Sequence, residues 1–164
     1  MNRQPFDLDG YVAGIRSGPC FICEILRGNP DYAHHVFYED AVAIAFLNRY
    51  PTLYGYTLVA PRVHREQAIV GFSRGDYHAL QDVIYRVGQA IDAVLRPERL
   101  YVLSLGSQQG NAHVHWHLAP LPPGIPFEDQ QFAALDMTRG LLNIGDDDMR
   151  ELADRLRQAM AGTA

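Results

Sequence analysis

Short apolar runs separated by turn residues fill the first two thirds of the chain. Val36–Tyr38 and Val42–Phe46 are two such runs joined by a turn at Glu39-Asp40, and Tyr56–Ala60 is a third that stops at Pro61. Short runs of apolar, β-branched or aromatic residues bounded by turn residues are typical of strands. Leu100–Leu105 has the same character, so the pattern predicts four strands before residue 106.

In three other segments the spacing of apolar residues predicts helices. Between about 76 and 96, apolar residues recur at i, i+3, i+4 and i+7, which predicts one buried helix face, and Pro97 ends the pattern. The members of this stripe are Leu80, Val83, Ile84, Val87, Ile91, Val94 and Leu95. Residues 8–16 predict a short helix. A helix over 146–160 is predicted with Asp146 as its cap; its apolar face holds Met149, Leu152, Ala153, Leu156 and Met160.

The stretch from Ala112 to Pro120 alternates histidine with apolar residues. His113, His115 and His117 occupy every second position. In a strand, alternate side chains share a face, so three imidazoles are expected in a row, with Val114, Trp116 and Leu118 on the other face. We expect Pro120 and the prolines after it to end regular structure.

Five strands and a single long crossover helix indicate an α+β fold with an antiparallel sheet. A chain of 164 residues fits one domain with a sizeable core, so we expect a single domain over 1–164.

Composition narrows the class of protein. The chain is 48% apolar and 20% charged, as in ordinary globular proteins, and no apolar run is long enough for a membrane helix. Residues 1–7 lack the apolar core of a signal peptide, which predicts a cytoplasmic protein. A net charge of −5 argues against nucleic acid as a partner but allows a small anionic ligand.

The three alternating histidines favour two kinds of chemistry. They can hold a metal, or they can offer a nucleophile with a second imidazole beside it for a phosphoryl group. A hydrolytic metal centre usually adds a carboxylate, and this stretch has none. A strand that merely exposes histidines to solvent is the remaining interpretation.

Cys20 and Cys23, the only cysteines, form a CxxC pair. Without a secretory signal this spacing indicates half a zinc site or a redox pair rather than a disulfide framework. Two small buried thiols without a ligand are the simpler alternative.

Two motifs together resemble the histidine-triad (HIT) superfamily of nucleotide hydrolases and transferases. Residues 113–119 match its His-φ-His-φ-His-φ-φ signature, where φ is an apolar residue. Residues 45–51 and 55–64 resemble its nucleoside-binding strand and the segment that follows. The resemblance covers about 20–120, and the remaining C-terminal extension carries the helix at 146–160. The resemblance implies a HIT-like sheet and a homodimer. The helix at 76–96 is the most apolar candidate for the contact between the two chains.

The resemblance also assigns roles. His115 is expected to attack the α-phosphorus of a nucleotide and form a nucleotidyl-histidine, and His117 to assist. Asn48 is expected at the ribose hydroxyls, although a turn asparagine before Pro51 is an equally simple interpretation. Donors for the phosphates are expected in the loop that contains Ser107, Gln109 and Asn111.

In zinc-bearing branches of the superfamily the metal is held by CxxC, a downstream histidine and the first histidine of the triad. Here these positions are Cys20, Cys23, His64 and His113, which implies one structural Zn²⁺ per chain.

Tyr56 departs from the family, because a histidine that supports the active site normally stands there. A phenol forms hydrogen bonds but does not carry a proton at neutral pH as imidazole does.

The resemblance favours a nucleotide hydrolase acting on a dinucleoside polyphosphate or a nucleoside phosphoramidate. A nucleotidyltransferase or phosphorylase is the alternative enzyme. A zinc-stabilised nucleotide-binding module with little activity is the alternative outside enzymes, and Tyr56 favours it.

Overall fold

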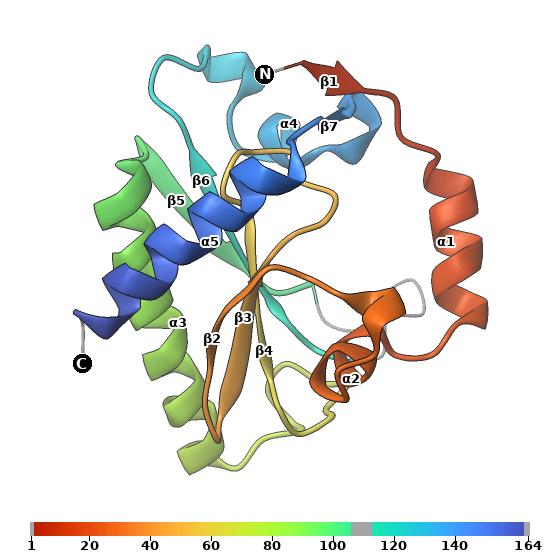
Figure 1. Ribbon diagram of the computed structural model, residues 1–164, viewed down its shortest axis with the longest axis vertical. Helices are drawn as coiled ribbons and strands as arrows, with labels where there is room; N and C mark the ends of the chain where they lie inside the picture. Colours follow the sequence, from red (N-terminus) through yellow and green to blue (C-terminus); the bar gives the residue numbers. More distant parts are fainter. Residues whose placement is uncertain (1, 106–112, 163–164) are drawn as a thin grey trace.

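The runs predicted as strands pair into one antiparallel sheet. The computed structural model describes residues 2–105 and 113–162, and within them the sheet has five strands in the order β2-β3-β4-β6-β5 (Figure 1). The strands are β2 (Val36–Glu39), β3 (Ala43–Leu47), β4 (Thr57–Pro61), β5 (Arg99–Leu103) and β6 (Trp116–Leu121). The predicted α+β fold is confirmed.

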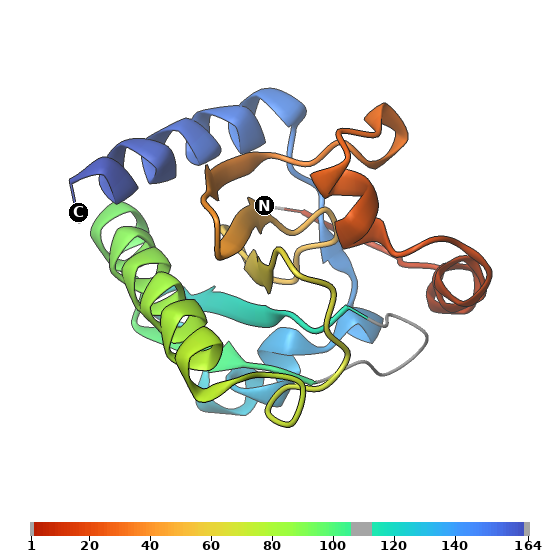
Figure 2. The same ribbon diagram turned by 90° about the horizontal axis from the view of Figure 1, so that it is seen from below.

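Both faces of the sheet are covered. Helices α3 (Arg74–Leu95) and α5 (Asp146–Ala161) lie along one face, and α1 (Leu8–Ser17) and α2 (Phe21–Leu26) lie on the opposite side (Figure 2). In β3, Ala45 packs into the core under α3 and α5, whereas its neighbour Phe46 packs into a second core with α2. Alternation along a strand therefore divides the interior into two layers.

The apolar stripe predicted for the long helix is buried within one chain. Leu80, Val87 and Ile91 are fully buried, and they pack in the same core as residues of β3, β6 and α5. The helix begins after Ser73, whose hydroxyl accepts the backbone N–H of Asp76 as an N-cap. The stripe is therefore satisfied within one chain, and the expected homodimer stays a prediction.

The C-terminal helix has the predicted apolar face but a different cap. Its five predicted apolar residues are all buried. Gly145 is the N-cap residue, and Asp146 is the first residue of the helix. The Asp146 carboxylate instead lies 3.0 Å from Nε2 of His35. The pattern placed the helix correctly, whereas this distant partner decides what the aspartate does.

The histidine stretch is only partly a strand. β6 begins at Trp116, so His113 and His115 precede it. The alternation holds nonetheless, because Val114, Trp116 and Leu118 all face the core under α3. β6 also continues through Pro120, contrary to the sequence prediction. The ladder between β4 and β6 ends at Leu118, so Pro120 lies beyond the residues paired on that side.

Short elements near the two ends of the chain have no sequence period and were not predicted. β1 (Arg3–Gln4) pairs with β7 (Leu141–Leu142). Between β6 and β7 lie two 3₁₀ turns, η3 (Phe127–Asp129) and η4 (Met137–Arg139), and the single-turn helix α4 (Phe132–Leu135). A further 3₁₀ turn, η1 (Pro30–Tyr32), precedes β2. None of the described helices is long and apolar enough to cross a membrane.

Candidate active site and metal centre

Four side chains from three segments meet beside α2. Cys20 and Cys23 lie at the start of α2, His64 follows β4, and His113 precedes β6. One ligand atom from each lies within 4.8 Å of the other three. The sequence-predicted ligand set is therefore brought together by the fold.

The spacing of these atoms fits a tetrahedral metal ion. Nδ1 of His113 lies 3.6 Å from each cysteine Sγ, and Nδ1 of His64 lies 3.3 Å from Sγ of Cys23. Ligands held 2.0–2.3 Å from a tetrahedral zinc ion lie about 3.5 Å from one another. Two thiols and two imidazoles are also the donors that zinc prefers.

In each imidazole of the cluster, the nitrogen that does not face the thiols lies near a polar group of the protein. Nε2 of His113 donates to the carbonyl oxygen of Pro61 at 2.8 Å, which leaves Nδ1 without a proton and directed at the thiols. Nε2 of His64 lies 3.8 Å from the Glu66 carboxylate. Burial lowers the pKa of His113 to about 4, so the ring is neutral, the form that binds metal.

The two cysteines are free thiols in the structure. Burial, followed by the neighbouring Cys20, raises the pKa of Cys23 to about 11. Redox-active CxxC pairs show the opposite shift, toward a stable thiolate. The two imidazoles that lie beside these thiols favour a metal site over a redox pair.

His115 is a buried polar residue in the wall of a cavity. Its Nδ1 donates to the carbonyl oxygen of His113 at 2.9 Å, so its proton is on Nδ1 and Nε2 keeps a free lone pair. Burial lowers the pKa of this histidine, which keeps the ring neutral. A neutral imidazole with an unprotonated nitrogen is able to act as a nucleophile.

His117 lies beside His115, with ring centroids 4.7 Å apart. Its Nδ1 lies 3.1 Å from the hydroxyl oxygen of Tyr56. Burial raises the pKa of Tyr56 to about 12, so this hydroxyl keeps its proton. When the hydroxyl donates to Nδ1, the proton of the neutral His117 ring is on Nε2, where it can donate a hydrogen bond to a ligand.

Both histidines line a cavity of about 530 Å³, a size typical of small-molecule sites. Its walls come from α1, the turn at 48–56, the ends of β4 and β5, and residues 135–137. The ring centroid of Phe21 lies 6.1 Å from that of His115, and Phe21 in turn contacts the ring of His34, which lies 5.2 Å from that of Phe46. The sequence indicated no role for Phe21 or His34, because Phe21 stands at a variable position of the CxxC pair and His34 belongs to no motif.

Asn48 lines the same cavity, but its side chain is partly engaged. Its Oδ1 accepts the backbone N–H of Tyr50 at 2.9 Å, as expected for a turn asparagine. The side chain of Phe46 packs in the core beside α2, whereas the side chain of Leu47 packs in the core under α3 and α5. The expected phosphate donors Ser107, Gln109 and Asn111 lie outside the described residues.

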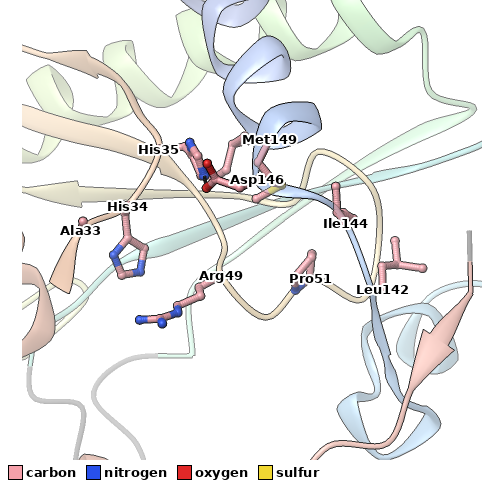
Figure 3. A pocket seen from close by; sticks show the side chains of 10 residues that line it. Ala33, His34, His35, Arg49, Pro51, Leu142, Ile144, Asp146 and Met149 are labelled. Atoms are coloured by element: carbon pink, nitrogen blue, oxygen red, sulfur yellow. Dashed lines mark ion pairs between the residues drawn. The ribbon is translucent and has the colours of Figure 1, made fainter. Parts of the chain in front are cut away.

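A smaller cavity of about 260 Å³ lies beside the N-terminus of α5 (Figure 3). The ion pair between His35 and Asp146 borders it. His34 and Arg49 border both cavities, and Figure 3 shows them turned away from that ion pair. The larger cavity holds the paired histidines and is the candidate active site.

The antiparallel sheet brings a neutral histidine pair to a cavity, beside a Cys2His2 cluster. This combination is typical of a histidine-triad type of protein. The chain belongs to the HIT domain family, whose family model matches residues 29–123. An uncharacterised HIT-like protein of Saccharolobus solfataricus is 30% identical over 104 residues, which are 62% of this chain and 73% of that protein. The adenosine 5′-monophosphoramidase hnt1 of Schizosaccharomyces pombe is 26% identical over 71% of this chain and 92% of its own.

Solved structures show the same fold. A hypothetical histidine triad nucleotide-binding protein from Sulfolobus tokodaii superposes with a TM-score of 0.70 at 23% identity, over 87% of this chain and 93% of its own. A zinc-bound histidine triad family protein from Mycobacterium smegmatis gives 0.65 at 22% identity, over 87% and 94%. The sequence-based recognition of the family is confirmed.

Proposed function

We propose that the protein is a nucleotide hydrolase that cleaves at the α-phosphate through a nucleotidyl-histidine intermediate. One observation carries the proposal most directly. The hydrogen bond from His115 to the carbonyl of His113 leaves the His115 Nε2 lone pair unprotonated beside the cavity. The name of the Schizosaccharomyces pombe relative, adenosine 5′-monophosphoramidase, supports this class of reaction.

In the first step, Nε2 of His115 attacks the α-phosphorus while the bond from phosphorus to the leaving group breaks. The leaving group departs with its electron pair and takes any proton it needs from water, while the Nε2–H of His117, whose ring lies beside that of His115, can donate a hydrogen bond to it. Water then attacks the phosphorus, the bond to His115 breaks, and a nucleoside monophosphate is released. Splitting one displacement into two lowers each barrier.

The nucleoside is proposed to lie near Asn48, because this residue lines the cavity within the motif that resembles the family's nucleoside-binding strand. The side chain of Asn48 has its Nδ2 amide left to donate to a ribose oxygen, since Oδ1 accepts from Tyr50. Dinucleoside polyphosphates and nucleoside phosphoramidates both present the required leaving group.

Cys20, Cys23, His64 and His113 are proposed to hold one zinc ion. A bound ion supplies no open coordination position when four protein ligands surround it, so its contribution is structural. It joins α2 to the segment that carries His115, and so fixes the position of the nucleophile.

Transfer to phosphate or to a sugar phosphate is the alternative, since the acceptor in the second step decides between hydrolysis and transfer. A binding module is the second alternative, suggested by Tyr56. The contact between Tyr56 and His117 favours an enzyme, because the side chain that replaces the family's histidine still reaches the triad.

Incubation with a panel of nucleotides, with and without phosphate, tests the proposal. We expect nucleoside monophosphate as the product, and a quenched reaction with labelled nucleotide should place the label on the peptide that holds residues 113–119. His115→Ala should lose both the label and nearly all turnover. Full turnover by this variant contradicts the proposed nucleophile, and a nucleoside diphosphate formed only with phosphate indicates transfer.

A further inference from the structure

The segment that carries His64 contacts the histidine segment at two places. The backbone N–H of Val114 donates to the carbonyl oxygen of Arg65 at 2.7 Å, and Nε2 of His113 donates to the carbonyl oxygen of Pro61 at 2.8 Å. Arg65 directly follows His64 in the chain, and Val114 directly follows His113. The two hydrogen bonds therefore hold these two imidazoles together, with ring centroids 4.8 Å apart.

The hydrogen bond between Arg65 and Val114 is not part of the sheet. β4 ends at Pro61, β6 begins at Trp116, and the ladder between them covers residues 57–59 and 116–118. Residues 62–73 form neither helix nor strand. Irregular segments have no ladder of their own to hold them in place, so contacts of their side chains must do so.

The side chain of Arg65 supplies such contacts. Its guanidinium donates to the carbonyl oxygen of Gly71 and, at 2.7 Å, to the carboxylate of Asp76 in the first turn of α3. The same group lies 4.8 Å from the ring centroid of Phe72, which is the geometry of a cation–π contact. One planar group with several donors thus ties residue 65 to the end of its own segment and to α3.

Phe72 extends this cluster to the histidine segment. Its ring lies edge-on to that of Trp116, with centroids 6.1 Å apart, and Tyr77 of α3 stands next to both at 5.9 and 6.2 Å. Trp116 is buried and directly follows His115 in the chain. The contacts of Arg65 therefore connect the beginning of α3 to the segment that carries the proposed nucleophile.

We propose that Arg65 is a positioning residue for the metal ligands and for the nucleophile. Its side chain keeps the carbonyl of residue 65 beside Val114, so that His64 and His113 are brought together before a metal ion binds and His115 is placed at the cavity. Arg65 is not one of the described residues that line the cavity, so it acts only through these neighbours. The effect on His115 rests on the proposed function, whereas the effect on the ligand pair rests only on the proposed metal site.

Metal affinity tests the effect on the ligand pair without any substrate. The affinity for Zn²⁺ is measured by competition with a chromophoric chelator, well below the melting temperature of each protein. We expect Arg65→Ala to bind Zn²⁺ about tenfold more weakly, because losing a group that orients metal ligands typically costs about 10–100-fold in affinity. Arg65→Lys keeps the charge without the planar fork that reaches two acceptors, so its loss should be smaller.

Arg62→Ala is the matched control. Arg62 precedes His64 and is also ion-paired, but its partner is Glu39 at the end of β2. We expect this variant to bind Zn²⁺ as the unsubstituted protein does. Asp76→Asn should cause part of the loss. Combined with Arg65→Ala it should add nothing further, since both changes remove the same contact.

A role in stability alone predicts a different result. In that case Arg65→Ala lowers the melting temperature of the metal-free protein, but its affinity for Zn²⁺ at the lower temperature is unchanged. Turnover of adenosine 5′-phosphoramidate is then compared with both proteins saturated with Zn²⁺. We expect kcat to fall about tenfold in Arg65→Ala with KM unchanged, because the nucleophile is misplaced while the residues that line the cavity remain.

Unchanged Zn²⁺ affinity in Arg65→Ala, an equal loss in Arg62→Ala, or no Zn²⁺ binding by the unsubstituted protein overturns the proposal. If the affinities change as expected but the unsubstituted protein cleaves no nucleotide, the proposed hydrolase is wrong while the role of Arg65 toward the metal ligands stands. If the affinities change and kcat does not, the role toward His115 is wrong and the proposed hydrolase stands.

Discussion

The hydroxyl of Tyr56 lies 3.1 Å from Nδ1 of His117, although the two residues are 61 positions apart. β4 and β6 pair so that Leu58 stands opposite His117, which brings the start of β4 alongside this histidine. The phenol therefore occupies a supporting position next to the imidazole. It fixes which nitrogen of His117 faces the ligand when it donates its proton.

Replacing Tyr56 by Phe should lower kcat/KM about tenfold, because His117 loses the partner that orients it. Tyr56→His restores a ring that can form the hydrogen bond and should recover most of the rate. The two variants are compared by steady-state turnover of the same nucleotide, with circular dichroism to show that both are folded. Equal rates for Tyr56→Phe and the unsubstituted protein would show that the contact has no role in turnover.

Metal analysis of freshly purified protein should find about one zinc ion per chain, bound by the Cys2His2 cluster. Removing the ion with a chelator should lower the melting temperature, since metal binding stabilises only the folded chain. Cys23→Ser should lose the ion and show the same lower temperature with or without chelator. His117→Ala should keep the ion, because His117 is not one of the four ligands.

His117 should make the protein less stable in acid. Burial, together with the neighbouring His115, lowers the pKa of His117 to about 3, whereas an exposed histidine takes up its proton near pH 6.5. Between these values the unfolded chain binds more protons than the folded chain, so the free energy of unfolding falls as the pH is lowered. The loss from one such group is about 1.4 kcal/mol per pH unit.

Urea unfolding at about pH 7.5 and about pH 5 measures this effect. His117→Gln has no titrating ring, so its stability should fall less between the two pH values, by about 1–2 kcal/mol. Comparing the two proteins cancels the protons taken up by the other buried histidines. An identical fall in both would mean that His117 is protonated equally in the folded and unfolded chains.

Asn48→Ala should weaken binding of ribonucleotides by about 1–3 kcal/mol, the cost of leaving polar partners unpaired. It should also lower the melting temperature slightly, since Oδ1 holds the turn at Tyr50. Binding of 2′,3′-dideoxy analogues should hardly change. An equal loss for both kinds of nucleotide would restrict Asn48 to shaping the turn.

We propose that two copies of the chain pair through β5. Within the described residues β5 has a single hydrogen-bonded neighbour, β6, and it exposes half of Val102. An edge strand with an exposed apolar residue is suited to pairing with a second copy. Light scattering at micromolar concentration should give the mass of a dimer.

Val102→Lys should shift the dimer toward monomer, because it places a charge at the proposed contact. Val70→Lys makes the same change at another exposed valine and should leave the mass unchanged. A monomer in the unsubstituted protein, or a dimer that survives Val102→Lys, would refute pairing through this edge.

Most of the helices and strands, and part of the candidate site, can be predicted from the amino-acid sequence alone. Periodicity reports which side chains are buried, and burial is a local property of each strand or helix, so the five strands and the face of α5 were predicted. The alternation at His113, His115 and His117 and the CxxC pair were visible for the same reason, and family resemblance joined the cysteines to His64.

The contacts that these residues make follow from the three-dimensional fold and could not be predicted from the sequence. The pairing of Tyr56 with His117 depends on the register between β4 and β6, and the His35 partner of Asp146 depends on how α5 meets the turn before β2. The place of α1 beside the cavity depends on two-residue strands that carry no period. Contacts between segments far apart in the chain arise from packing of the whole fold, which no local pattern specifies.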